Sequence, residues 1–396
     1  MGKPTIRFEG YTDDWEQRKL GDDLVSIHTG TNLLGSTTNI GMPLIKMGNI
    51  QRGYFDTSKV EFLAENEQPD NEDIANYGDF FFNTRNTLEL VGKGATWMKN
   101  SGEYAFNSNI ARFELRNIDT IFFNYLYNTE TMTRQIHARA MGTTSVAAIY
   151  PRTLESVGYL VPCMKEQQKI GAYFKHLDHL ITLHQRKCEE TKKLKKFMLQ
   201  KMFPKKGEKV PEIRFGGFTD DWEQRKFGEI VEKYEDPVET PTEGYTRLGI
   251  RSHAKGTFHS YVEKGKELET AKMFRVAADK FIVNITFGWE HAVAITDEND
   301  AGKLVSHRFP QYSFNAGMEP KFFRYLILDE NFKHHLELSS PGGAGRNRVL
   351  KLSDMLQYKM NFPSEAEQKK IAAYFDDLDH LITLHQRKCE ETKKLK

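Results

Sequence analysis

Paired carboxylates are the residues of this chain whose type and spacing most readily suggest catalysis. Asp13 and Asp14 precede a tryptophan near the N-terminus, and Asp220 and Asp221 precede another in the middle of the chain. Adjacent carboxylates could hold a divalent cation for phosphodiester hydrolysis. Aspartate near the start of a domain is more often a turn former or a cap, because its side chain accepts hydrogen bonds from nearby backbone amides. We therefore interpret both pairs as turns or caps.

The sequence contains none of the short motifs on which common catalytic sites are built. It has no GxxxxGK[ST] phosphate loop, no GxSxG nucleophile turn and no HExxH metal motif. The [DNS]PP[YFW] tetrapeptide, with which amino-methyltransferases hold a flipped base, is also missing. The three cysteines form no CxxC pair, so a disulfide framework or a structural zinc site is not expected. The sequence predicts a chain that is not an enzyme on its own and binds no metal or cofactor directly.

Side chains that can read bases gather in expected loops of two otherwise dissimilar blocks. Asn, Gln, Arg, Ser and Thr match the hydrogen-bonding groups of base edges, and Lys and Arg neutralise phosphates. Such loops are often merely solvated, but their equivalent places in both blocks favour a binding role. The candidate DNA contacts of the first block are Lys46, Asn49, Gln51, Arg52, Arg85, Arg139, Thr143 and Thr144. Those of the second block are Arg247, Arg251, Ser252, Lys255, Arg346, Asn347 and Arg348.

The frame around these blocks is written twice. Residues 7–22 and 214–229 agree at 12 of 16 positions, and residues 166–195 and 367–396 agree at 26 of 30. The blocks between them barely resemble each other, apart from weak echoes such as FFNYL and FFRYL. A fixed frame with a varied filling indicates one fold that carries two different surfaces.

The second repeated segment predicts a long helix in each copy. Apolar residues recur at spacings of three and four, and no proline interrupts the pattern. We expect the two stripes to bury each other, with antiparallel pairing favoured over parallel. The expected packing residues are Ile170, Phe174, Leu177, Ile181, Ile371, Phe375, Leu378 and Ile382. His184 and His385 continue the stripes and are interpreted as packed, hydrogen-bonded residues.

Composition excludes several classes of protein. With 39% hydrophobic residues among 396, the chain can build two or three domains and is not expected to be disordered. No apolar run approaches the roughly 20 residues that span a membrane, and the N-terminus lacks a signal pattern. These features predict a cytoplasmic protein. Its net charge of +1 is low for a chain that binds nucleic acid alone, so clustered charge or a partner is expected.

The repeated segments resemble a known family. The openings RFEGYTDDWEQRKLGD and RFGGFTDDWEQRKFGE, and the helices with EQxKIxxYFxxLDHLITLHQRKCEETKKLK, resemble the specificity subunit of type I restriction-modification enzymes. The run GRNRVLKLSDMLQYKMNFPSEAEQKKIAAYF before the second helix matches as well. The resemblance covers essentially the whole chain.

The resemblance implies a division of labour. Each block would be a target recognition domain that reads one half of a split sequence in double-stranded DNA. The helices would set the half-site spacing and dock two modification subunits, which bind S-adenosylmethionine and methylate adenine. Restriction subunits, with ATP-driven translocase and nuclease activity, would complete the complex. S-adenosylmethionine, ATP and Mg²⁺ are therefore expected in partner subunits and not in this chain.

The expected fold is α+β, with two globular α/β recognition domains separated by a pair of long antiparallel, coiled-coil-like helices in an internal pseudo-two-fold repeat. The expected bounds are 1–160 for the first domain, 161–203 for the first helix, 204–213 for a linker, 214–363 for the second domain and 364–396 for the second helix.

The two repeats differ in two respects, and the sequence also allows one alternative function. The loop GTTSVAAIYPRTL lacks the early basic residues of GGAGRNRVLKL, so a role of Arg346 or Arg348 does not transfer to the first block. The sequence ends at Lys396, the counterpart of Lys195, and lost contacts or disorder are expected there. The alternative function is a coiled-coil adaptor that presents two protein-binding modules and does not bind DNA.

Overall fold

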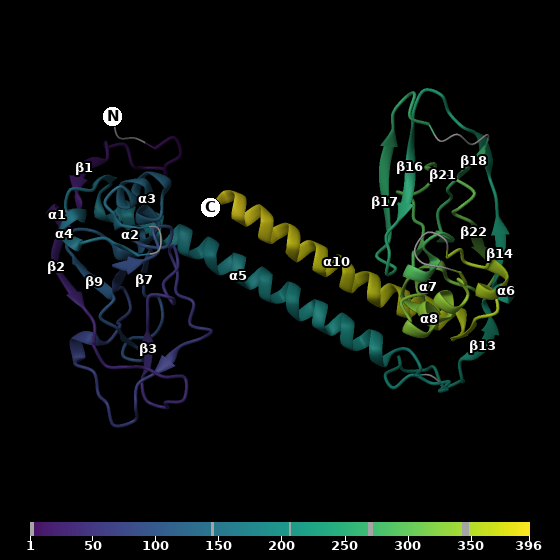
Figure 1. The fold of residues 1–396 in the computed structure, drawn as a ribbon, viewed down its shortest axis with the longest axis horizontal. Coiled ribbons are helices and arrows are strands. Elements are labelled where there is room, and N and C mark those ends of the chain that lie inside the picture. Colours follow the sequence, from purple (N-terminus) through teal and green to yellow (C-terminus); the bar gives the residue numbers. More distant parts are fainter. Residues whose placement is uncertain (1–3, 144–145, 206, 268–271, 343–347) are drawn as a thin grey trace. The chain divides into compact units, whose positions relative to one another are not determined.

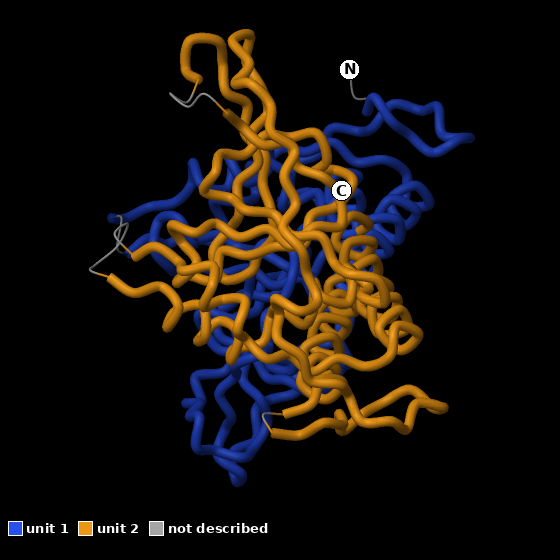
Figure 2. Tube along the Cα trace, turned by 90° about the vertical axis from the view of Figure 1, so that its right-hand side faces the viewer, with its two compact units in different colours: residues 1–183, 389–396 blue, residues 184–388 orange. Residues whose placement is uncertain are grey.

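The structure is a computed structural model that describes residues 4–143, 146–205, 207–267, 272–342 and 348–396. The chain divides into two compact units, coloured blue and orange in Figure 2. Unit 1 comprises residues 1–183 and 389–396, and unit 2 comprises residues 184–388. Each unit therefore contains one globular domain and parts of both long helices.

A four-stranded antiparallel sheet with the strand order β2-β9-β5-β7 forms the centre of unit 1. The central strand β5 (Phe80–Asn83) is buried along its whole length. Successive side chains of a strand point to opposite faces, so Phe80 and Phe82 enter one core cluster while Phe81 enters another. The other strands of this sheet are β2 (Leu24–Thr29), β7 (Gly94–Thr96) and β9 (Ile110–Leu115).

Smaller sheets and short helices complete unit 1 (Figure 1). The sheets pair β1 (Glu16–Lys19) with β12 (Gly158–Val161), place β3 (Pro43–Ile45) between β4 (Glu61–Phe62) and β8 (Ala105–Phe106), and place β11 (Ala147–Ala148) between β10 (Met141–Gly142) and β6 (Arg85–Asn86). The helices are α1 (Leu20–Asp23), η1 (Asn71–Asp73), α2 (Thr120–Tyr127), α3 (Glu130–His137) and α4 (Pro151–Leu154).

Unit 2 repeats this core and enlarges its periphery. The sheet β14-β22-β19-β20 corresponds to β2-β9-β5-β7, and a five-stranded sheet has the order β15-β18-β21-β16-β17. The strands are β13 (Glu223–Lys226), β14 (Val231–Tyr234), β15 (Pro237–Glu239), β16 (Tyr245–Ile250), β17 (Thr257–Val262), β18 (Lys272–Arg275), β19 (Lys280–Val283), β20 (Val293–Ile295), β21 (Leu304–Val305), β22 (Gln311–Phe314) and β23 (Lys359–Phe362). The helices are α6 (Phe227–Ile230), η2 (Gly288–Glu290), α7 (Pro320–Leu326), α8 (Glu330–Leu338) and α9 (Leu352–Met355).

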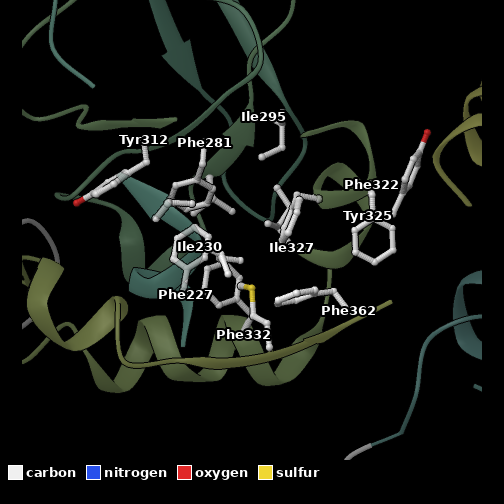
Figure 3. Packing of buried hydrophobic residues seen from close by; sticks show 14 of the residues in the cluster. Phe227, Ile230, Phe281, Ile295, Tyr312, Phe322, Tyr325, Ile327, Phe332 and Phe362 are labelled. Carbon is white, nitrogen blue, oxygen red and sulfur yellow. The ribbon is translucent and has the colours of Figure 1, made fainter. Parts of the chain in front are cut away.

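Aromatic rings fill the core of unit 2. Figure 3 shows Phe227 and Phe281 packed against Phe332, with Ile230 and Tyr312 beside them. The ring centroids of Phe227 and Phe281 lie 4.8 Å apart in an edge-on arrangement, which the quadrupoles of aromatic rings favour. This core holds the sheet β14-β22-β19-β20, whereas Leu248 and Ile250 of β16 pack in a separate cluster.

Two long helices carry the repeated frame. Helix α5 spans Met164–Lys201 and helix α10 spans Glu365–Leu395. Within unit 2, His184, Cys188 and Lys195 of α5 contact His385, Ile382 and Asp379 of α10. Partner numbers fall as residue numbers rise, so the helices pack antiparallel. The predicted α+β fold with two related domains and a packed helix pair is confirmed. Among the described residues, no helix has the length and apolar character needed to cross a membrane.

Candidate nucleic-acid interface and helix-docking surface

The first candidate loop follows β3 and is held by one buried amide. Asn49 is 8% exposed. Its side chain accepts a hydrogen bond from the backbone of Lys46 and donates two, to the carbonyl oxygens of Asp56 and Lys59. The Lys46 ammonium pairs with Glu61 at 2.5 Å. Asn49 and Lys46 are therefore engaged in shaping the loop, whereas Arg52 beyond them is exposed.

Arg52 belongs to a cluster of basic side chains from three parts of unit 1. Arg52 lies 3.0 Å from Nε2 of His137 at the end of α3, and Lys93 donates to the side-chain oxygen of Gln51 at 2.7 Å. Burial, followed by the Arg52 charge, lowers the pKa of both His137 and Lys93. The positive charge of Arg52 beside Lys93 creates a local field that favours an anion such as phosphate. The sequence pattern pointed to neither Lys93 nor His137, although the flanking glycines of Lys93 mark a close backbone approach.

Arg85 and Thr143 lie at opposite edges of one small sheet, separated by β11. Arg85 lies on β6, which pairs with β11, and Thr143 follows β10, which pairs with the other edge of β11. Both residues are exposed. Arg139, by contrast, binds the carbonyl oxygens of Gln135 and Thr153 and the hydroxyl of Ser156. It therefore braces the segment between α3 and α4.

The equivalent loop of unit 2 joins β16 to β17 and adopts an unusual backbone. His253 and Ala254 have φ angles of 61° and 48°, and their amides donate to the carbonyl oxygens of Glu290 and His291. Residues other than glycine hold such angles only where their surroundings impose them. The loop exposes Arg251 and Lys255, and the Arg251 guanidinium lies over the ring of Phe258 at 5.4 Å.

The short helix η2 links two candidate clusters of unit 2. The Ser252 hydroxyl donates to the Glu290 carboxylate at 2.5 Å, and the Arg348 guanidinium lies 5.2 Å from the ring centre of Trp289. Arg348 also donates to the backbone oxygens of Glu337 and Ser340. Trp289 and Glu290 thus join segments that are far apart in the sequence, and residue patterns did not reveal them.

The remaining candidates lie on a strand or outside the described part of the chain. Arg247 is half-buried on β16, where it pairs with Ser260 of β17 and Leu304 of β21. Thr144, Arg346 and Asn347 lie outside the described residues.

The apolar residues predicted to pack one helix on the other contact two surfaces: a globular domain and the other helix. Leu177 and Leu378 are each 5% exposed along the helices, and Ile181 and Ile382 are half-buried. Phe375 and Ile371 belong to the core of unit 2, and Phe174 packs on Tyr125 of α2 at 5.2 Å. Ile170 packs at the edge of the unit 1 core. The first turns of each helix therefore hold a domain, and later turns approach the other helix.

Each unit contains the same lysine–aspartate–tyrosine contact. In unit 2, Lys195 pairs with Asp379 at 2.6 Å and lies over the Tyr325 ring at 5.1 Å. Lys396, Asp178 and Tyr125 make the same contacts in unit 1, at 2.5 Å and 5.5 Å.

The tyrosine hydroxyls complete the contact. Tyr125 donates to Asp178, and Tyr325 donates to Asp376 and Asp379. Burial and the facing carboxylates raise the pKa of both tyrosines well above its ordinary value. Each hydroxyl is therefore a permanent donor between a domain and a helix. Lys396 repeats the contacts of Lys195 with its aspartate and its tyrosine.

The acidic pairs Asp13–Asp14 and Asp220–Asp221 lie in the segments just ahead of β1 and β13. Among the described residues, no group of three or more His, Cys, Asp or Glu side chains could hold a metal ion. The backbone oxygen of Asp13 accepts a hydrogen bond from the Arg7 guanidinium.

Comparisons with known proteins agree with this arrangement. The sequence profile described as the type I restriction modification DNA specificity domain matches residues 12–193 and 219–394. Two specificity subunits of type I restriction enzymes from Methanocaldococcus jannaschii, MjaX and MjaVIII, are 26% and 23% identical to the chain. Each alignment covers 97% of this chain, with 91% of the MjaX subunit and 90% of the MjaVIII subunit.

A solved structure shows the same fold. The S subunit of a type I restriction-modification system from M. genitalium aligns with 100% of this chain and 96% of its own, with a TM-score of 0.57 and 13% identity. Because the family profile covers both repeats, the chain belongs to the family of type I restriction-modification DNA specificity subunits. The resemblance seen in the sequence is confirmed.

Proposed function

We propose that each domain reads one half of a bipartite DNA site, and that the helices set the half-site spacing and dock two modification subunits. The recognition domains would be residues 1–160 and 214–363, with spacer helices at 161–203 and 364–396 and a linker at 204–213. S-adenosylmethionine, ATP and Mg²⁺ would act in the modification and restriction subunits.

One observation carries this proposal. The contacts that join domain to helix are the same in both units, down to the Lys195–Asp379 and Lys396–Asp178 pairs. The loops that carry the candidate DNA contacts differ in length, partners and backbone between the units. Two identical partner subunits require identical docking surfaces, whereas two different half-sites require different reading surfaces.

Charge and exposure favour particular residues of the reading surface. In unit 1 these are Arg52 with Lys93 and His137, together with Arg85 and Thr143 on the small sheet. In unit 2 they are Arg251 and Lys255 on the β16–β17 loop and Arg348 beside Trp289. A good bidentate base contact contributes about 1–3 kcal/mol of discrimination, so a few of these side chains would suffice for each half-site. Asn49 and Arg139 would act by positioning the loops.

The test is to co-express the chain with a modification subunit and to map the methylated adenines. Exchange of residues 20–150 for the corresponding block of another specificity subunit should change one half of the methylated sequence and leave the other half unchanged. The control is Lys264→Ala, a substitution of a surface lysine outside the candidate clusters. It should alter neither half of the methylated sequence. An unchanged site after the block exchange, or no methylation in any combination, would contradict the proposal and favour the adaptor.

A further inference from the structure

A buried carboxylate in unit 2 holds an exposed histidine beside the β16–β17 loop. Asp300 lies between β20 and β21 and is 2% exposed. Its Oδ1 atom lies 2.8 Å from Nε2 of His259 and accepts a hydrogen bond from the Thr257 hydroxyl at 2.9 Å. Thr257 and His259 alternate with Phe258 along β17, so their side chains point to the same face of the strand. The His259 ring is therefore anchored through one of its two nitrogens.

The other bonds of Asp300 determine which ring nitrogen carries the proton. The Asp297 amide donates to Oδ2 at 3.2 Å, and the Thr257 hydroxyl donates to Oδ1. Because both carboxylate oxygens act as acceptors, Nε2 of His259 donates to Asp300. In a neutral imidazole, a proton on Nε2 leaves Nδ1 as an acceptor. Among the described residues, none forms a hydrogen bond with Nδ1 of His259.

Strand β17 adjoins the loop whose side chains are proposed to contact DNA. The Arg251 guanidinium donates to the backbone oxygen of Thr257 and lies 5.4 Å from the ring centre of Phe258. Strands β16 and β17 form a two-stranded ribbon at one edge of the five-stranded sheet (Figure 1). The major groove of DNA is wide enough to admit such a ribbon. His259, with 34% of its side chain exposed, therefore lies on an element whose shape suits the groove.

Unit 1 has a similar pair with different surroundings. Nε2 of His28 lies 2.8 Å from Oδ1 of Asp73, and the His28 side chain is likewise 34% exposed. Its Nδ1 atom, however, lies 3.9 Å from the Glu72 carboxylate. A carboxylate at this place repels the phosphates of an approaching duplex. His28 therefore has the same anchoring as His259 without an open nitrogen.

We propose that His259 is a specificity-determining residue of the second domain, and that Asp300 is its positioning residue. This inference rests on the proposed function, because it assigns one base of the half-site that the second domain would read. In the major groove, cytosine and adenine present exocyclic amines, whereas guanine and thymine present only acceptors. An outward Nδ1 that accepts a hydrogen bond selects cytosine or adenine at one position of that half-site.

Asp300→Asn tests the part that the ring proton plays. The Asp297 amide still needs an acceptor, so it binds the oxygen of the new amide and leaves the NH2 group facing His259 and Thr257. The NH2 group can only donate, so Nε2 becomes the acceptor and the ring proton moves to Nδ1. The outward nitrogen then donates. The preferred base at that one position should switch from cytosine or adenine to guanine or thymine, which a residue that merely holds the fold would not cause.

The measurement is the methylated sequence produced by each chain when it is co-expressed with a modification subunit. The second half-site is the half that exchange of residues 20–150 leaves unchanged. His259→Leu removes the acceptor and should lower the discrimination at a single position of this half by roughly five- to a hundredfold. The first half should not change. His28→Leu is the matched control, because it breaks an equivalent pair in unit 1, and it should alter neither half.

The outcomes separate this inference from the proposed function. If the natural chain methylates a bipartite site and His259→Leu methylates the same site, only the inference is overturned. Weaker methylation by His259→Leu at all sites alike, with base preference unchanged, would overturn it too, since His259 would then act through the fold or a phosphate. A retained preference for cytosine or adenine in Asp300→Asn would overturn the role of Asp300, and if that variant does not fold, His259→Leu alone decides. Absence of bipartite methylation by the natural chain would instead contradict the proposed function itself.

Discussion

A buried arginine–glutamate pair fixes the start of each repeat at the scale of single residues. Arg7 binds Glu166 and Arg214 binds Glu367, each through two nitrogen–oxygen contacts of 2.7–2.8 Å. The glutamates are 0% and 1% exposed. An ionised carboxylate at such a place depends on its partner, because burial without one leaves an uncompensated charge.

This dependence predicts a large loss of stability for Arg214→Met. The substitution keeps most of the side-chain volume but leaves the Glu367 carboxylate buried and unpaired, which should cost about 3 kcal/mol. Amide hydrogen exchange in the first turns of α10 measures this loss of stability. Lys264→Met, which removes an exposed pair with Glu243, is the control and should cost at most about 0.5 kcal/mol. In the double variant Arg214→Met/Glu367→Gln, removal of the unpaired charge should recover part of the lost stability. A loss for Arg214→Met alone that is no larger than for Lys264→Met would contradict the argument.

Residue type alone could not separate reading residues from residues that shape loops. Asn49 and Arg139 have the side chains of base readers, yet both bind backbone carbonyls of their own loops. Asparagine and arginine suit both tasks, because the same donors match carbonyl and base oxygens. The contacts of Arg52 with His137 and of Arg348 with Trp289 depend on long-range packing, which leaves no periodic trace in the sequence.

The paired helices pose a different question at the scale of elements. Their existence could be predicted, because an apolar period of three and four is a local property of the sequence. Antiparallel packing was only favoured over parallel, because the period does not set the relative direction of two helices. The division of the stripe between domain and helix could not be predicted, because Phe174 and Ile170 satisfy the same pattern as Ile181. His184 and His385, expected to be packed and hydrogen-bonded, meet each other with Nδ1 atoms 3.1 Å apart.

The histidine pair predicts that the helix pairing weakens in acid. Burial, then His184, Lys187 and Lys388, lower the pKa of His385 below its ordinary value of 6.5. The unfolded chain therefore binds more protons between the two values, so stability is complete above about pH 6.5 and falls as the pH drops below it. Unfolding in urea should show a larger loss between about pH 7.5 and 5.5 for the natural chain than for His385→Gln, which cannot become charged. Equal losses in both chains would contradict the role of this pair.

At the scale of the whole molecule, duplication explains which parts are alike. The same Lys–Asp–Tyr contact and Arg–Glu pair recur in both units, while η2 and the five-stranded sheet occur, among the described residues, in unit 2. The repeat itself could be predicted from the sequence, because near-identical segments fold alike in like surroundings. The extension of its outer sheet by β15, β18 and β21 in unit 2 could not, because these strands have two to four residues and β21 pairs with β16 and β18, which are distant in the sequence.

Helix length is the remaining variable of the proposed spacer, and an insertion tests it. Four residues added to α5 after Thr191 lengthen that helix by about 6 Å. The insertion leaves the contact of His184 with His385 in place, but displaces Lys195 from Asp379 by about one turn. Because one DNA turn of about 34 Å holds about ten base pairs, the preferred half-site gap should change by about two base pairs, or the complex should fail to assemble. Mapping of methylated adenines measures the gap, and gel filtration with the modification subunit measures assembly.

The control is the same insertion after Gly265, in an exposed turn with a positive φ. It should leave both unchanged, and an unaltered gap in the assembled α5 variant would rule out the helices as the spacer.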